Sequence, residues 1–251
     1  RKILLGIKMR LSRVYLQQEI INSQTKLTIS KDAEQYNYIT KVLRLKNNHQ
    51  VIIFNNSGYD FLCELINITN KFLELNIIEK NKNHSESNFK IHLAQAISKP
   101  SHFELTLQKS VELGVTEITP VISDYSETLK YSDKKADRFK KIIISACEQS
   151  NRSIIPNFNN PVTFNDFINN NSQSVIIMPT PRATKKFDVN LLNNIDAAII
   201  LDGCEGGFSE KEESLSRNSN SHLITLGPRI LRTETAGISL ISILQFLKGD
   251  L

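Results

Sequence analysis

Two segments of the chain combine glycine-rich turns with charged and hydroxyl side chains directly after apolar runs. Residues 199–209 read Ile-Ile-Leu-Asp-Gly-Cys-Glu-Gly-Gly-Phe-Ser, and residues 226–236 read Leu-Gly-Pro-Arg-Ile-Leu-Arg-Thr-Glu-Thr-Ala. Glycine lets the backbone bend sharply and approach a ligand closely. Open α/β sheets bind their ligands at the carboxyl ends of the strands. Two such turns after neighbouring predicted strands therefore predict one shared ligand pocket.

Each segment also has a plainer interpretation. The first is consistent with an ordinary strand-to-helix turn, and it is not the G-x-G-x-x-G pattern of dinucleotide-binding folds. In the second, Thr233 or Thr235 is a candidate helix cap, with the charged side chains simply solvated. Two further polar segments, 95–99 after a predicted strand and 145–152 at a predicted helix end, are by themselves more typical of a surface than of a site.

The elements that would position these segments change in kind along the chain. Residues 9–80 contain short β-prone runs at 11–16, 26–29, 51–55, 59–68 and 72–78, with one helical pattern around 32–43. Regular short strands separated by turns predict a small β-barrel. Residues 79–88 are polar throughout and cannot bury a core, so a domain boundary is expected there.

After residue 88 apolar runs alternate with helical patterns. The runs are 91–97, 117–122, 175–178, 197–201 and 222–226. Ser101 with Glu104, and Ser209 with Glu212, have the spacing of a helix capping box. The Asn-rich stretch 165–174 is expected to be a loop, and the last helix is expected from about Thr235 to Gly249. Strands alternating with helices predict a mostly parallel sheet covered on both faces.

Net charge, the spacing of cysteines and histidines, and the length of apolar runs indicate the partner, the location and the class of the protein. Residues 1–90 carry a net charge of +6, and the remaining residues carry −1. This excess of positive charge favours a polyanion as the partner of residues 1–90. Residues 1–8 are interpreted as an extension before Met9, and without them the surplus is +3. Three scattered cysteines without a C-x-x-C pair favour the cytoplasm. No histidine pair has zinc-ligand spacing, so no metal is expected, and no run is long enough to span a membrane.

Several strings, in order over nearly the whole chain, resemble one family. They include residues 108–115, 118–120, 146–149 and 205–209, and above all 226–236. The chain resembles the RsmE family of 16S ribosomal RNA uridine-N3 methyltransferases, within the SPOUT superfamily. One departure is Cys204, where the family usually has proline. Because proline fixes φ, its loss is expected to loosen the loop.

The resemblance implies an α/β fold in which a PUA-like β-barrel (9–80) and a linker (81–88) precede a SPOUT-type trefoil-knot methyltransferase domain (89–251). It also implies a homodimer, 16S ribosomal RNA of the small subunit as partner, and S-adenosylmethionine as cofactor. The implied cofactor-binding residues form three groups along the chain: Met178 and Pro179; Leu201, Gly203, Glu205, Gly206 and Gly207; and Leu226, Gly227, Ile230, Leu231 and Arg232.

The reaction that the resemblance implies defines what the other residues must do. Uracil N3 carries a proton, so methyl transfer needs a proton acceptor and a group that stabilises negative charge on the uracil oxygens. Arg232 is the candidate for the charge, and Glu234 either accepts the proton or orients Arg232. The cations expected to contact RNA phosphates are Arg10, Arg13, Arg44, Lys46, Lys99 and Arg152.

Two rival interpretations remain at the level of sequence. Cys204 motivates a non-catalytic RNA-binding or ribosome-assembly protein with a degenerate cofactor pocket. The other rival is a methyltransferase of the same superfamily that acts on a different RNA site. A covalent role for Cys204 is disfavoured, because methylation at N3 does not require a cysteine nucleophile and no histidine motif accompanies it.

Overall fold

The computed structural model describes residues 11–21, 23–126 and 132–251, so the predicted extension 1–8 and Arg10 lie outside the described residues. The chain forms two compact units. The first runs to Ser85 and also includes Asn151–Ile154, and the second comprises Glu86–Ser150 and Ile155–Leu251. The change of unit after Ser85 falls within the predicted linker 81–88. No sequence pattern indicated that Asn151–Ile154 belongs to the first unit.

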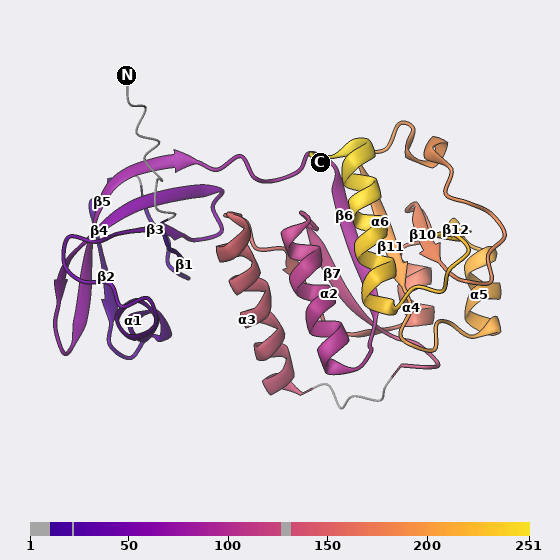
Figure 1. Cartoon of the computed structure of the whole chain (residues 1–251), viewed down its shortest axis with the longest axis horizontal. Helices are drawn as coiled ribbons and strands as arrows, with labels where there is room; N and C mark the ends of the chain where they lie inside the picture. Colours follow the sequence, from indigo (N-terminus) through magenta and orange to yellow (C-terminus); the bar gives the residue numbers. More distant parts are fainter. Residues whose placement is uncertain (1–10, 22, 127–131) are drawn as a thin grey trace, which may run out of the picture. The chain divides into compact units, whose positions relative to one another are not determined.

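The first unit is built around a five-stranded sheet with the order β1-β3-β4-β5-β2 (Figure 1). The strands are β1 Arg13–Tyr15, β2 Lys26–Ser30, β3 Gln50–Phe54, β4 Tyr59–Ile68 and β5 Phe72–Lys82. Only the β1–β3 pair is parallel among these described strands. Alternate side chains such as Leu27 and Ile29 are buried, which gives the sheet one apolar face.

The predicted helix over 32–43 is shorter and less regular than its pattern indicated. It consists of α1, Glu34–Asn37, followed directly by the π-helical turn η1, Tyr38–Val42. Thr40 Oγ1 donates to the Tyr36 carbonyl at 2.7 Å within this segment. Tyr36 and Ile39 are buried and pack on the sheet, so tertiary contacts hold a segment that is too short to be stable as an isolated helix.

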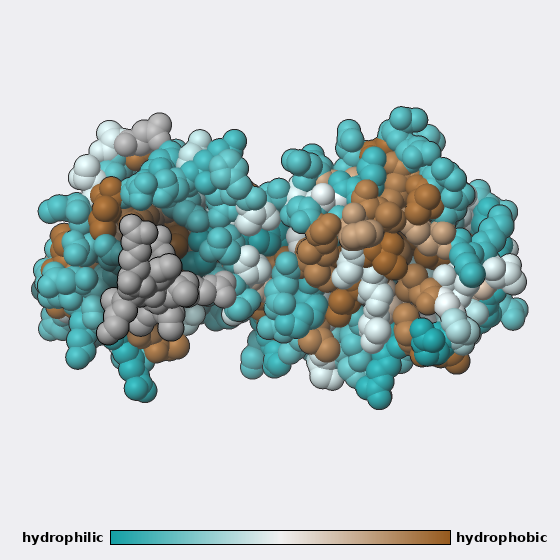
Figure 2. All heavy atoms as spheres, turned by 45° about the horizontal axis from the view of Figure 1, so that its top comes forward, coloured by the Kyte–Doolittle hydropathy of each residue, from teal (hydrophilic) through white to brown (hydrophobic). Residues whose placement is uncertain are grey.

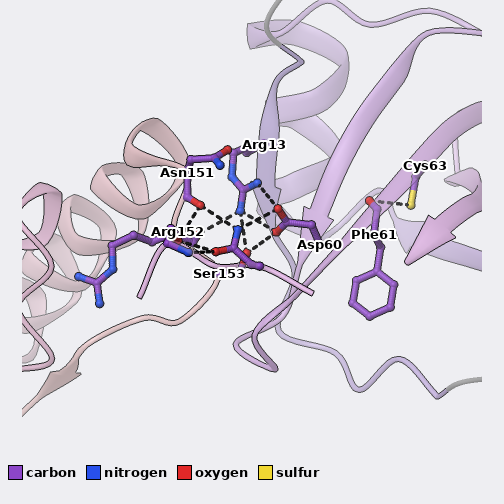
Figure 3. A network of polar contacts seen from close by, with 9 residues as sticks. Arg13, Asp60, Phe61, Cys63, Asn151, Arg152 and Ser153 are labelled. Carbon is purple, nitrogen blue, oxygen red and sulfur yellow. Dashed lines mark hydrogen bonds and ion pairs between the residues drawn. The ribbon is translucent and has the colours of Figure 1, made fainter. Parts of the chain in front are cut away.

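A buried ion pair lies at the centre of the polar network in the first unit (Figure 3). The two terminal nitrogens of Arg13 donate to the two carboxylate oxygens of Asp60, each at 2.8 Å. One of these nitrogens also donates to the Arg152 carbonyl at 3.0 Å and to Ser153 Oγ at 2.8 Å. The side chain of Arg13 is only 2% exposed. Arg13 therefore joins β1, β4 and the segment 151–154.

The charge state of Asp60 follows from the same contacts. Burial by itself raises the pKa of this carboxyl, but hydrogen bonds from Arg13, Ser153 and Asn83 outweigh burial and bring the pKa below its usual value. Asp60 is therefore an ionised counter-ion to Arg13. A buried guanidinium needs such a partner, because an unpaired charge in the interior is strongly unfavourable.

These contacts correct two predictions about RNA. Arg13 and Arg152 are 4% and 2% exposed, contrary to the expectation that both reach RNA phosphates from the surface. The guanidinium of Arg13 is occupied by Asp60, and the backbone of Arg152 accepts one of its hydrogen bonds. The sequence shows that Arg13 is a cation. It does not show that Asp60, 47 residues further along the chain, pairs with Arg13 in the interior.

The second unit contains a parallel sheet with the order β12-β10-β11-β6-β7-β8, in which β9 also pairs with β7. Its strands are β6 Lys90–Ala96, β7 Glu117–Ile122, β8 Asn157–Phe158, β9 Val162–Thr163, β10 Ile176–Pro179, β11 Ala197–Asp202 and β12 Ser221–Ile224. All the described pairings are parallel. The predicted parallel sheet is confirmed.

Helices cover both faces of this sheet, as predicted (Figure 1). The helices are α2 Pro100–Glu112, α3 Asp133–Ser150, α4 Phe164–Asn170, the 3₁₀ turn η2 Val189–Leu192, α5 Glu210–Arg217 and α6 Thr233–Lys248. α6 packs on β6, β11 and α2, and α3 packs on α2. Phe164, Phe167 and Phe208 pack with apolar side chains on the other face of the sheet, where α4 and α5 lie.

Two local predictions are wrong and one is confirmed. The stretch 165–174 begins with helix α4 rather than a loop, because Thr163 caps it and Phe164, Phe167 and Ile168 bury its apolar face. Ser101 does not cap α2, since the helix already starts at Pro100, a residue suited to the first helical position. The capping box of Ser209 and Glu212 is present at the start of α5.

The Arg13–Asp60 pair predicts a specific loss of stability. Asp60→Asn leaves the buried guanidinium without its counter-ion and is expected to lower the free energy of unfolding by about 3 kcal/mol at pH 7. Because the folded-state pKa of Asp60 lies below its unfolded value, this stabilisation is present above about pH 4 and is lost as the pH falls through the folded-state pKa. Urea unfolding at pH 7 and pH 3 measures both effects.

The control for this experiment is Asp32→Asn, which alters an exposed carboxyl of the same unit. It is expected to change stability by less than about 0.5 kcal/mol at either pH. An Asp60→Asn protein as stable as the wild type at pH 7 would contradict the role given to the ion pair.

Candidate active site

Three loops meet at one edge of the parallel sheet. They are the first loop, 180–182, after β10; the second loop, 203–208, after β11; and the third loop, 225–232, after β12. β10 pairs with both β11 and β12 in parallel, so the carboxyl ends of the three strands lie together. The loops line a cavity of about 410 Å³, and a smaller cavity of about 100 Å³ adjoins it between the first and third loops. The predicted shared pocket is confirmed.

The second loop depends on glycine at two positions. Gly207 has φ of +69°, a conformation that other residues adopt only with strain, and its N–H donates to the Cys204 carbonyl at 2.9 Å. A Cβ at Gly203 would lie 3.1 Å from the Gly207 Cα, so the loop also folds back closely on itself. The glycines therefore give the loop a compact turn that presents backbone groups to the pocket.

Cys204 stabilises this turn through its side chain. It is 5% exposed, and its Sγ donates to the Tyr125 carbonyl at 3.0 Å and lies 3.6 Å from the Gly207 carbonyl. Burial raises the pKa of the thiol, which disfavours the thiolate that a nucleophile requires. The sulfur contacts thus offset the expected loosening of the loop, and the geometry agrees with a structural cysteine.

The floor of the pocket is polar and buried. Gln95 Nε2 donates to the Gly203 carbonyl at 3.1 Å and to Thr233 Oγ1 at 3.2 Å, and Thr233 Oγ1 itself donates to the Gly203 carbonyl. These bonds tie the end of β6, the second loop and the first turn of α6 together. The position of the third loop relative to the second is therefore set by side chains from three different elements.

Asp202 is a buried acidic residue at the floor of the pocket. It is 2% exposed, and burial raises the pKa of its carboxyl to about 8 against the smaller effect of hydrogen bonds from the Gly203 and Gly237 N–H groups. The nearby charge of Glu234 raises the pKa further. Among the described residues, neither Asp202 Oδ2 nor Glu234 Oε2 has a hydrogen-bond partner. Asp202 was not among the residues predicted from the sequence, although it ends an apolar run directly before a glycine turn.

The rim of the pocket carries polar and charged side chains that contact one another. His102 Nδ1 lies 2.7 Å from Glu205 Oε1, which also accepts from the Lys99 N–H at 3.1 Å. Burial alone would raise the pKa of Glu205, but backbone hydrogen bonds and His102 outweigh it and the pKa lies below its usual value. Arg182 contacts the buried Glu213, with Nε donating to Oε1 at 3.0 Å, and its guanidinium also donates to the Phe208 carbonyl.

The predicted cofactor residues fall into three sets. Lining the larger cavity are Pro179, Gly203, Glu205, Gly206, Gly207, Ile230, Leu231 and Arg232. Leu226 and Gly227 line the smaller cavity. Met178 and Leu201 are fully buried in the sheet behind the pocket and are not among its lining residues. Further lining residues, which were not predicted as cofactor-binding, are His102, Thr180, Pro181, Arg182, Asp202 and Thr233.

Both predicted catalytic residues lie at this pocket. Arg232 is exposed and occupies the N-cap position of α6, and Glu234 is partly buried in the first turn of the same helix. Of the cations predicted to contact RNA, Arg44 and Lys46 are exposed in the first unit, and Lys99 is exposed at the N-cap of α2 in the second.

Comparisons with known proteins agree with this arrangement. A family model described as an RNA methyltransferase domain matches residues 85–245, and an RNA methyltransferase PUA domain matches residues 31–78. The chain is 39% identical over 250 residues to ribosomal RNA small subunit methyltransferase E of Buchnera aphidicola subsp. Schizaphis graminum, covering 98% of this chain and 100% of that protein. The chain belongs to the ribosomal RNA small subunit methyltransferase E family.

Other members of this family extend the comparison. The Bacillus subtilis protein is 27% identical and covers 89% of this chain and 93% of its own length. A crystal structure of ribosomal RNA small subunit methyltransferase E from Neisseria gonorrhoeae bound to S-adenosylmethionine is 31% identical, with a TM-score of 0.85 over 96% of this chain and 100% of that one. The predicted order of a PUA-like unit before a SPOUT-type α/β methyltransferase unit is confirmed.

The tight contact between Gly237 and Asp202 yields a stability prediction. A Cβ at Gly237 would lie 2.8 Å from Asp202 Oδ2 and 3.4 Å from its Cγ, but 3.7 Å from its Cβ. Gly237→Ala is therefore expected to destabilise the protein. In an Asp202→Ala background the clash disappears, and the better helix propensity of alanine should stabilise α6 by up to about 1 kcal/mol.

A double-mutant cycle in urea measures this change of sign. The four proteins are the wild type, the two single variants and the double variant. If Gly237→Ala lowers the free energy of unfolding equally in both backgrounds, the packing of Asp202 against α6 is not the reason that position 237 requires glycine.

Proposed function

We propose that this chain transfers a methyl group from S-adenosylmethionine to uracil N3 in 16S ribosomal RNA of the small ribosomal subunit. The observation that carries the proposal is the single pocket formed by the three loops after β10, β11 and β12. A relative with 31% identity over 96% of this chain is described as a small subunit methyltransferase bound to this cofactor.

The residues of the pocket fit S-adenosylmethionine. A volume of about 410 Å³ lies within the usual range for small-molecule sites. Ile230, Leu231 and Ala236 offer apolar surface for the adenine faces, and the glycine turn of the second loop offers backbone groups for its edge. The buried Asp202 and the partly buried Glu234 line this cavity and suit the positive charge of a sulfonium. When bound, the cofactor supplies the electrophilic methyl group, so the protein's task is to position and deprotonate the base.

Arg232 and Glu234 are suited to the two remaining tasks. Arg232 is exposed at the N-cap of α6, where the helix dipole adds to its positive charge, so it can stabilise negative charge that develops on the uracil oxygens. Glu234 Oε2 has no hydrogen-bond partner among the described residues. This favours Glu234 as the acceptor of the N3 proton over a role in orienting Arg232, because an orienting carboxylate would be engaged with the guanidinium.

The first unit and the pocket rim supply cations for RNA. Arg44 and Lys46 are exposed in the PUA-like unit, and residues 1–90 carry the positive surplus of the chain. Lys99 is exposed, and its backbone N–H contacts Glu205 of the second loop, so it lies beside the pocket itself. Cations positioned this way hold an RNA backbone without reading its sequence. A ribosomal RNA substrate is consistent with a cytoplasmic location.

A second copy of the chain is proposed as the partner of an apolar surface on α6. Ile243, Phe246 and Leu247 are 36%, 73% and 39% exposed on that helix, and Leu105 of α2 is 40% exposed. Figure 2 shows hydrophobic side chains gathered on the second unit. A homodimer through this end of α6 would supply the interface that the resemblance implies, while Glu234 lies at the other end of the same helix.

The proposed trefoil knot rests on the path of the chain after β12. β12 is at the edge of the sheet, yet α6 packs on β6 and β11 beyond β10. On the way, Thr225 forms a parallel bridge with Lys186, which belongs to the long connection between β10 and β11. A C-terminal segment that passes through this connection would account for both observations.

The function is tested in a strain that lacks the gene. Mass mapping of its 16S ribosomal RNA is expected to show loss of N3-methyluridine, restored by the wild-type gene but not by Arg232→Ala. With purified protein, Arg232→Ala should lower the rate of methyl transfer about 100-fold, because the loss of one donor that stabilises charge in the transition state costs about that much. Lys211→Ala, which removes an exposed cation of α5, is the control and should retain full activity.

The outcomes separate the rivals. Persistence of N3-methyluridine in the deletion strain would contradict the assigned substrate and favour another RNA site. Failure of the wild-type protein to bind S-adenosylmethionine would favour a non-catalytic RNA-binding protein. Full activity of the Arg232→Ala protein would remove this residue from the mechanism.

The dimer is tested by placing a charge on the apolar surface of α6. Phe246→Asp is expected to shift the protein from dimer to monomer in sedimentation equilibrium, because an interface centre does not tolerate an unpaired charge. Ile78→Asp is the matched control, since Ile78 is 47% exposed on β5 of the other unit. A Phe246→Asp protein that remains dimeric would place the interface elsewhere.

A further inference from the structure

Two acidic side chains, Asp202 and Glu234, line the same pocket. Thr233, adjacent to Glu234, hydrogen-bonds to the carbonyl of Gly203, which is adjacent to Asp202. Gly237 follows Glu234 by three residues on α6 and so lies on the same helix face. The backbone N–H of Gly237 donates to the Asp202 carboxyl, and a Cβ there would be 2.8 Å from Asp202 Oδ2. α6 thus carries Glu234 near Asp202, close enough for the charge of Glu234 to raise the pKa of the Asp202 carboxyl.

The pair has acceptor oxygens without donors. Within the described part of the chain, Asp202 Oδ2, Glu234 Oε2 and Gln95 Oε1 are buried and have no hydrogen-bond partner. All three belong to residues at the floor of one site, where Asp202 and Glu234 line the cavity. Buried polar oxygens that the protein leaves unsatisfied are costly and indicate a missing donor or cation.

The chain's own charges near the pocket are engaged elsewhere or lie at the surface. His102 of α2 pairs with Glu205 of the second loop, and Arg182 of the first loop pairs with Glu213 of α5. Arg232 at the start of α6 is exposed, whereas Asp202 of β11 is 2% exposed. Gln95 of β6 is neutral. The charged groups named here therefore leave the Asp202 carboxyl to be compensated by a proton.

We propose that Asp202 holds a proton at the pocket floor and releases it to solvent when a cationic sulfonium binds, so that the site selects S-adenosylmethionine over its neutral product by charge. This inference rests on the proposed function. Before binding, the proton neutralises Asp202. After binding, the sulfonium takes over that compensation, and the departing proton makes affinity depend on pH.

The raised pKa of Asp202 agrees with this exchange. Burial moves the pKa of its carboxyl to about 8, so it is protonated near neutral pH and ionises when a cation arrives. Without ligand, the folded protein holds a proton that the unfolded chain, with an ordinary aspartate, has released. Stability therefore falls as the pH rises from about 4 to about 8, and the ligand-free protein offers a readout that does not depend on methyl transfer.

The test compares S-adenosylmethionine with S-adenosylhomocysteine, which lacks the sulfonium charge but shares the adenosine and amino-acid groups. Calorimetric titrations of the full-length protein from pH 6 to pH 9 measure both dissociation constants. The ratio of the two constants should favour S-adenosylmethionine increasingly with pH, by up to about tenfold per pH unit below about pH 8, the limit for release of one proton, and then level off.

Asp202→Asn keeps the shape of the side chain but cannot ionise. It is expected to make the ratio independent of pH and to remove the decrease in stability between pH 4 and pH 8, with little change in affinity for S-adenosylhomocysteine. Asp196→Asn is the matched control, because Asp196 is an exposed aspartate that precedes the other end of the same strand. It should retain the wild-type pH profile.

A pH-independent ratio in the wild-type protein, or a wild-type profile in Asp202→Asn, overturns the proposed proton release while leaving the methyltransferase function intact. If Asp202→Asn does not fold, two other measurements report the same proton. One is the pH dependence of the ratio of dissociation constants in Glu234→Gln. The other is the dependence of the wild-type binding heat on the ionisation enthalpy of the buffer. If the wild-type protein binds neither compound at any pH, the proposed function fails, and this inference fails with it.

Discussion

The parallel alignment of β10, β11 and β12 is the constraint on which the site depends. Because parallel strands all end at the same edge, the three loops that follow them must meet there, although they are separated by many residues in the chain. The hydrogen bonds among Gln95, Gly203 and Thr233 then set how α6 meets the second loop. The pocket is therefore a consequence of sheet register together with a small buried polar cluster.

The two units use buried charge differently. In the first, Arg13 and Asp60 neutralise each other with bidentate hydrogen bonds, and the pair serves the structure. In the second, Asp202 is buried beside another acid, so the cost of its burial is met by protonation rather than by a counter-ion. A paired buried charge is a stable end state, whereas a protonated buried acid can still respond to a ligand.

The departure from the family at Cys204 illustrates how a loop tolerates a substitution. Proline would restrict the backbone directly, whereas the cysteine side chain reaches across to the Tyr125 carbonyl. Both limit the freedom of the turn by different physical means. The loop therefore keeps the compact form that positions Glu205 to meet His102 and the Lys99 N–H.

The sequence by itself determined the alternation of strands and helices, the glycine turns at strand ends, the capping box of α5 and, through the motif 226–236, the family. These features are local, and residue type and spacing encode them directly. Only the tertiary structure decided that Arg13 and Arg152 are buried, that 165–174 includes a helix, and that Asp202 lies beside Glu234. Each of these depends on a partner distant in the chain, and the periodicity of one segment carries no information about the charge or apolar surface that will pack against it.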